Sequence, residues 1–177
     1  MVDQYYQDAA GAVHFLTAQD QVNAGALKLP FPNPAWTAIS EAQAMAVLNP
    51  PLSLAKAQAA QVIAIQASCE SLIIAGQTSA ALGSLYTYPS GLTDQANLNA
   101  NVVSSLLPGL LAGWTTPQLC LNSVGVWAYL PHSVAEIQQV GSDVKAAIMA
   151  LLLKSANYQA EIALATTVAE VQAIVWV

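Results

Sequence analysis

Two histidines and ten acidic residues carry the chain's capacity for acid–base chemistry. His14 or His132 could act as a general base or a metal ligand, but either role needs an oriented partner. The surrounding patterns favour structural roles, because His14 lies in a strand-like segment and His132 comes directly before a helix start. We interpret His14 as a residue on a strand face and His132 as one that fixes a loop.

Most of the acidic residues have structural explanations. Three fall in the first turns of predicted helices, where the helix dipole favours a carboxylate: Glu41, Glu136 and Glu170. Asp8 belongs to a turn, and Asp94 is expected to cap a helix. A cell-wall or glycan hydrolase would need two carboxyl groups roughly 5–9.5 Å apart, and the acids that remain for such a pair are Glu70, Asp143 and Glu161.

The other chemical motifs are missing. Cys69 and Cys120 are distant in sequence and have no metal-binding spacing, so we interpret both as small buried residues without a disulfide. The sequence has no dinucleotide-binding glycine pattern, phosphate-binding loop, zinc-protease motif or nucleophile elbow. We therefore expect no catalytic residue, no cofactor and no metal.

Aromatic residues are the better candidates for contacts with other proteins. A buried indole removes about 150–250 Å² from water, so we assign Trp127 and Trp176 to the core. Trp36 and Trp114 lie beside proline or glycine and are candidates for an interaction surface. Tyr86 and Tyr88, in a predicted turn over 86–91, are further candidates for that surface.

The composition restricts the class of protein. The chain is 55% hydrophobic and 8% charged, and its four basic residues are all lysines. Soluble domains usually have about a quarter of their residues charged. The net charge of −6 and the scattered lysines argue against binding to nucleic acid. Residues 95–135 contain no charged side chain. Either the surface consists of Ala, Ser, Thr, Asn and Gln, or another chain covers much of it, and we favour the second interpretation, in a homo-oligomer or a larger assembly.

A membrane span needs about 18–20 consecutive apolar residues. The apolar run at 106–114 is broken by proline and glycine, and the run at 146–153 is bracketed by Lys145 and Lys154. The first residues also lack the pattern of a signal peptide. We expect a soluble protein that is made in a cytoplasm and has no membrane span.

The first 50 residues are predicted to form a small β-rich region. Residues 4–7 and 12–16 favour strands on either side of a turn at 8–11, and this pattern indicates a hairpin. A proline-rich passage at 29–34 should be irregular, and a short strand at 36–39 precedes a helix at 40–48 that opens with a capping box. Two prolines then end the helix, so we place the domain boundary between residues 50 and 51.

Residues 51–177 are predicted to be mainly helical. Apolar residues at helical spacing indicate helices over 53–75, 95–107 and 133–163, with a final short helix from 167 and a short one around 78–82. Residues 115–129 favour a hairpin that turns at 122–125. The C-terminal residues are apolar, so we expect Trp176 to be docked. The predicted class is α+β and mostly α-helical: an N-terminal β-hairpin region and a C-terminal helical domain with a short β-hairpin.

The second segment resembles a family of unknown function, DUF4376, found in proteins encoded in the tail-fibre regions of bacteriophages and prophages. The matching residues include Cys69, Ser79 to Gly83, Thr93 to Leu98, Gly125 to Trp127, Leu130 to Ser133 and Ile174 to Trp176, within a stretch from Leu54 to Trp176. The most specific block is Asp-Gln-x-Asn-Leu. The resemblance implies these structural anchors: Asp94, Gln95, Asn97, Leu98, Trp127, His132 and Trp176.

The N-terminal residues resemble the start of many tail-fibre and fibre-assembly proteins. Those proteins open with a Tyr-Tyr-x-Asp hairpin and a short helix after Ile-Ser or Ile-Thr, which match residues 5–16 and 39–43. Relatives usually carry arginine in the first long helix, whereas this chain has Lys56 there.

The two resemblances imply a non-enzymatic component of a phage tail, at the tail tip or on a fibre. Its partners would be other tail proteins, and its location would be the tail of the virion and, during assembly, the host cytoplasm. An alternative is a tail-fibre assembly chaperone that acts in the host cytoplasm and then leaves. The hydrolase is a third hypothesis.

Overall fold

The computed structural model describes residues 3–28, 30 and 32–177. The chain divides into two compact units, Met1–Ser53 and Leu54–Val177, so the division falls just after the predicted boundary. The described residues form six helices and two small antiparallel sheets. This architecture confirms the predicted α+β, mostly helical class.

The first unit contains a three-stranded antiparallel sheet. Strands β1 (Gln4–Gln7) and β2 (Val13–Leu16) form the predicted hairpin, and β3 (Thr37–Ile39) pairs with the other edge of β1. In the turn, the Asp8 carboxylate accepts hydrogen bonds from the backbone N–H groups of Ala10 and Ala12. Gly11 has a φ of 87°, a conformation that glycine adopts without strain.

Two short helices accompany this sheet. Helix α2 (Glu41–Leu48) begins at Ser40 with the predicted capping box. Helix α1 (Ala18–Ala26) is absent from the sequence prediction, although Thr17 and Asp20 form a capping box at its start. The predicted irregular passage at 29–34 includes two positions, 29 and 31, outside the described residues.

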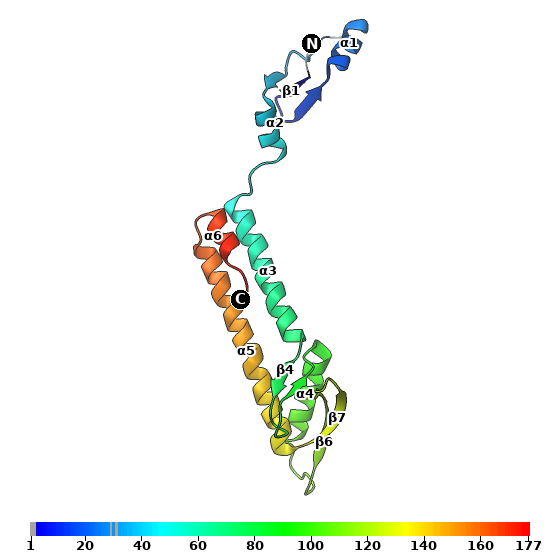
Figure 1. The fold of residues 1–177 in the computed structure, drawn as a ribbon, viewed down its shortest axis with the longest axis vertical. Coiled ribbons are helices and arrows are strands. Elements are labelled where there is room, and N and C mark those ends of the chain that lie inside the picture. The colour runs from blue at the N-terminus through cyan, green and yellow to red at the C-terminus, as the bar shows by residue number, and fades with distance from the viewer. Residues whose placement is uncertain (1–2, 29, 31) are drawn as a thin grey trace. The chain divides into compact units, whose positions relative to one another are not determined.

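The second unit is built on two long helices. Helices α3 (Leu54–Ile74) and α5 (Val134–Leu164) lie side by side, and α6 (Val168–Ala173) packs beside them at one end (Figure 1). Their shared core contains Ala57, Ile65, Ile162 and Val171. The capping boxes at Ser133 and Thr167 start α5 and α6 as predicted.

Polar side chains of α3 also fix the end of the chain. The Gln58 side chain donates to the carbonyls of Ile162 and Ala165, and that of Gln61 donates to the carbonyl of Ile174. Trp176 is half-buried, with its ring centroid 5.5 Å from that of Tyr158. Trp176 is therefore docked on α5, as expected.

The other end of the unit carries a four-stranded antiparallel sheet in the order β4-β5-β6-β7. Strands β6 (Thr115–Leu121) and β7 (Trp127–Ser133) form the predicted hairpin. The prediction of a helix around 78–82 is wrong, because β4 (Gln77–Ser79) lies there, and β5 (Tyr86–Tyr88) occupies the start of the predicted turn. Gly76 brings these strands together, because a Cβ on it would lie 2.9 Å from the carbonyl oxygen of Tyr88.

Helix α4 (Leu92–Ser104) packs against α5 and β6. It begins three residues before the predicted start, with Gly91 as its N-cap residue. The Asp94 carboxylate accepts a hydrogen bond from the Gly91 N–H, 3.1 Å away, so Asp94 closes the first turn from inside the helix. Its predicted capping function is thus performed from the third helical position.

Helix α3 has a property that the sequence analysis missed. Among the described residues, it is the one helix that is long and apolar enough to cross a membrane by length and composition. Only 17% of its most apolar window is buried. The predicted apolar stripe is buried at Ile65 and Cys69, whereas Leu72 is exposed.

Candidate functional site: a groove beside α4

The most specific block of the sequence resemblance, residues 94–98, lies in the first turns of α4. Its side chains divide between two hollows on opposite sides of the helix. Gln95 and Leu98 line a groove against α5, and Asp94 and Asn97 line a smaller hollow against β6 and β7. Helix α4 therefore lies at the centre of the candidate site.

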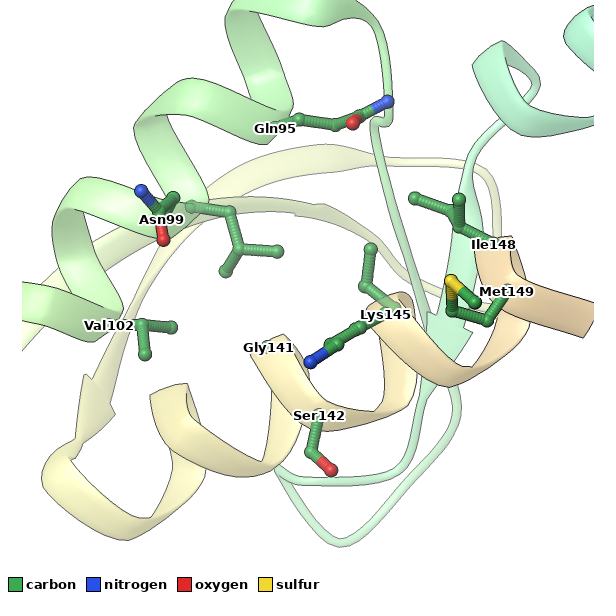
Figure 2. A pocket seen from close by; sticks show the side chains of 10 residues that line it. Gln95, Asn99, Val102, Gly141, Ser142, Lys145, Ile148 and Met149 are labelled. Carbon is green, nitrogen blue, oxygen red and sulfur yellow. The ribbon is translucent and has the colours of Figure 1, made fainter. Parts of the chain in front are cut away.

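The groove between α4 and α5, which we call the α4–α5 groove, has a volume of about 580 Å³. Its lining is mainly apolar and includes Leu98, Ile148 and Met149. Figure 2 shows the exposed Lys145 side chain extending back along α5 toward Gly141. Lys145 is the one charged residue among the described residues that line the groove.

Gly141 sets how closely α4 approaches α5. A Cβ at this position would lie 2.7 Å from the Cγ2 atom of Val102 on α4, closer than real contacts allow. The group that packs against Gly141 is therefore a side chain and not another backbone. The sequence did not predict that Val102 and Lys145 line one groove, because only the packing of α4 on α5 brings them together.

The hollow on the other side of α4 is polar and smaller, about 220 Å³. Asn101 joins the helix to the sheet there: its amide nitrogen donates to the Gln118 side chain at 2.9 Å, and its oxygen accepts from the Thr116 hydroxyl at 2.8 Å. The exposed ring of Tyr129 lines the same hollow. Asn101 thus holds both side chains and, more weakly, the carbonyl of Pro117.

Beneath the sheet, Tyr88 and His132 form a fully buried hydrogen-bonded pair. The Tyr88 hydroxyl oxygen lies 2.9 Å from His132 Nε2, and His132 Nδ1 lies 2.9 Å from the carbonyl oxygen of Leu130. The carbonyl can only accept, so Nδ1 donates to it, and in this tautomer Nε2 is the acceptor for the Tyr88 hydroxyl. Burial raises the pKa of the Tyr88 hydroxyl.

The structure corrects three assignments made from the sequence: Tyr88, Trp127 and His132. Tyr88 was a candidate for an interaction surface, but it is fully buried in the core with Leu98 and Cys120. Trp127 was assigned to the core, but it is 48% exposed, because it begins β7 at the solvent-facing end of the hairpin. His132 lies in β7 and not in a loop before the helix.

The remaining aromatic candidates are half-buried. Tyr86 and Trp114 both pack against the core below α4, so each has only part of its ring available to a partner. In the first unit, Trp36 stacks on His14 with ring centroids 4.0 Å apart. His14 in turn donates from Nε2 to the Asp8 carboxylate at 2.9 Å, and this hydrogen bond is the main cause that lowers the pKa of Asp8.

The three acids left for a hydrolase do not form a pair. Asp143 and Glu161 are separated by about 27 Å along α5, given the rise of an α-helix. Glu70 follows Cys69, whose thiol contacts the carbonyl of Leu151. That level of α5 is roughly 12 Å from Asp143 and 15 Å from Glu161. These separations exceed the range that glycoside hydrolysis uses.

In the part of the chain that the structure describes, no arrangement of residues supports metal binding or thiol chemistry. No group of three or more histidine, cysteine, aspartate or glutamate side chains there could hold a metal ion. Cys69 and Cys120 are free and buried, and burial raises the pKa of the Cys120 thiol, which lowers its reactivity.

No protein-family model matches the chain, and no curated protein and no solved structure matches it either.

Proposed function

We propose that this chain is a non-enzymatic component of a bacteriophage tail, at the tail tip or on a fibre, that works by contact with other tail proteins. The observation that carries the proposal is a set of exposed large apolar side chains in the uncharged stretch 95–135. We call it the uncharged surface, and its exposed large apolar residues are Val103, Leu106, Leu107, Leu111, Val124, Val126, Trp127 and Tyr129. Exposed large apolar and aromatic side chains are typical of the centre of a protein interface.

The tip of the β6–β7 hairpin presents part of this surface in a fixed shape. The Asn122 side chain accepts hydrogen bonds from the backbone N–H groups of Val124 and Val126, at 3.1 and 2.9 Å. Gly125 completes the turn with a φ of 83°. A turn held by its own side chain loses little conformational entropy on binding, which favours its use as a contact.

The experiment that tests the proposal measures incorporation into particles. Replacing Val124 and Val126 together by serine removes two exposed apolar side chains and leaves the Asn122 hydrogen bonds in place. We expect at least about a tenfold loss of the protein from purified particles. A matched control is Leu164→Ser, which removes one apolar side chain on α5 that is more exposed than either valine, and it should leave incorporation unchanged.

The chaperone alternative makes a different prediction. The wild-type chain would raise the yield of soluble fibre trimers on co-expression with the neighbouring fibre gene and would be missing from finished particles. Wild-type protein that is missing from particles would overturn the proposed function. Equal incorporation of the double variant and the control would show that the hairpin tip does not contribute to the contact with other tail proteins.

A further inference from the structure

The outward face of α3 carries a regular pattern that neither the core nor the proposed function uses. Exposed residues recur along it at spacings of four and three: Lys56, Ala60, Ile63, Ala67, Glu70 and Ile74. Ile63 is 66% exposed in the middle of a long helix. A repeat of this kind places its members in one stripe, and apolar residues at this spacing, which four of the six are, are typical of a helix that packs against a second helix.

The charges in this stripe are arranged symmetrically. Lys56 and Glu70 each lie seven residues from Ile63, on opposite sides, so each is about 10.5 Å from it along the axis. If two copies of α3 pack antiparallel with their Ile63 side chains at the two-fold axis, Lys56 of one copy lies level with Glu70 of the partner subunit. A parallel pair would instead place like charges level with each other.

The small residues of the stripe favour close packing of the same kind of helix. Ala60 and Ala67 flank Ile63 on the exposed face, so two copies can approach closely around a central isoleucine. An interface between two identical copies around a two-fold axis must be self-complementary, and the charges of this stripe satisfy that condition. The Lys56 ammonium has three N–H donors, so it can add a carboxylate to its other contacts.

The surface area of the chain also suits such a partner. The chain exposes 11032 Å², whereas two folded domains of these lengths would together expose roughly 9,700 Å². The excess of about 1,300 Å² is more than the ~800 Å² that each partner contributes to an interface of standard size. We infer that the chain forms a homodimer through antiparallel packing of α3, centred on Ile63, with reciprocal pairs between Lys56 and the partner's Glu70.

Exchanging the charges tests this arrangement in the full chain. Lys56→Glu or Glu70→Lys alone makes both reciprocal contacts repulsive, so sedimentation equilibrium should give a dissociation constant raised about tenfold. The double variant restores opposite charges and should return the constant to within about threefold of wild type. Ile63→Asp should abolish the dimer, whereas Leu164→Asp should leave it intact, and circular dichroism checks the folding of each variant.

Disulfide formation tests the orientation. Ile63→Cys should link two copies on oxidation, because the two positions meet at the axis. Ile74→Cys lies on the same stripe but would be about 33 Å from its counterpart, beyond the roughly 7 Å that a disulfide spans. The parent chain is the background control, since both native cysteines are buried.

Several results would overturn the inference. They are a wild-type chain that stays monomeric, a double charge variant no better than the single ones, or a link at residue 74 as efficient as one at residue 63. Because α3 is also apolar enough for a membrane, the wild type and Ile63→Asp are mixed with neutral phosphatidylcholine vesicles. Binding to them without dimer formation would contradict the inference as well. The test involves no tail protein, so its result is separate from that of the proposed function.

Discussion

The buried hydrogen bond between Tyr88 and His132 makes the most direct prediction about the core. Tyr88→Phe removes the hydroxyl that donates to His132 Nε2, and the rest of the ring keeps its place in the core. The imidazole nitrogen is then a buried acceptor without a donor, which costs about 1–3 kcal/mol. We expect the free energy of unfolding to fall by that amount near neutral pH.

The same hydroxyl predicts how stability depends on alkaline pH. Burial raises the pKa of Tyr88 above its ordinary value of about 10. The unfolded chain releases this proton near pH 10, while the folded chain keeps it. The contribution of the protonated Tyr88 hydroxyl to the free energy of unfolding is therefore fully present below pH 10. It is lost as pH rises toward the pKa of the folded state, by about 1.4 kcal/mol per pH unit.

The assay is urea unfolding at several pH values from 8 to 11.5, with Tyr129→Phe as the matched control because its ring is 71% exposed. Wild type and the control should lose stability together above pH 10. Tyr88→Phe should start lower and lose less with pH. If the three curves stay parallel, Tyr88 does not hold its proton through burial and the reasoning is wrong.

Three further variants test the packing of the second unit. Gly141→Ala gains about 1 kcal/mol of helix propensity but forces its methyl group against Val102, so we expect a net loss of roughly 1–2 kcal/mol in thermal melts; Val102→Ala in the same chain should recover most of it, and a stabilised single variant would contradict the contact. Ser133→Ala removes the cap of α5 and should cost about 1 kcal/mol in urea unfolding, an expectation that an unchanged midpoint would refute. Trp176→Ala should cost roughly 2 kcal/mol and expose the chain end to carboxypeptidase, because its half-buried ring holds that end on Tyr158; equal rates of trimming in wild type and variant would show that the end is not docked.

The helices could be predicted from the sequence because neighbouring residues determine where several of them begin. Ser40, Ser133 and Thr167 form capping boxes whose donors and acceptors lie within four residues. The same signal at Thr17 and Asp20 was present but overlooked, and it would have predicted α1.

The short strands and the candidate site could not be read in the same way. Strands β4 and β5 have three residues each and form through long-range pairing: β4 pairs with β5 at the close approach of Gly76, and β5 also pairs with β6. Because Pro89, Ser90 and Gly91 follow Tyr88 and are typical turn residues, the sequence predicted a turn where Tyr88 lies in a strand. Trp127 shows the opposite error, since a large aromatic residue is not buried when its strand position faces solvent. The α4–α5 groove joins residues more than forty positions apart, such as Gln95 and Lys145, and no local pattern connects them.

Quantitative mass spectrometry of purified phage particles tests the central claim most directly. If the chain is a tail component, it should be present at a fixed ratio to an established tail protein across independent preparations, and this ratio should survive washing in high salt. A protein that is abundant in the lysate but missing from the particles, or present in amounts that vary from one preparation to the next, would contradict the proposed function.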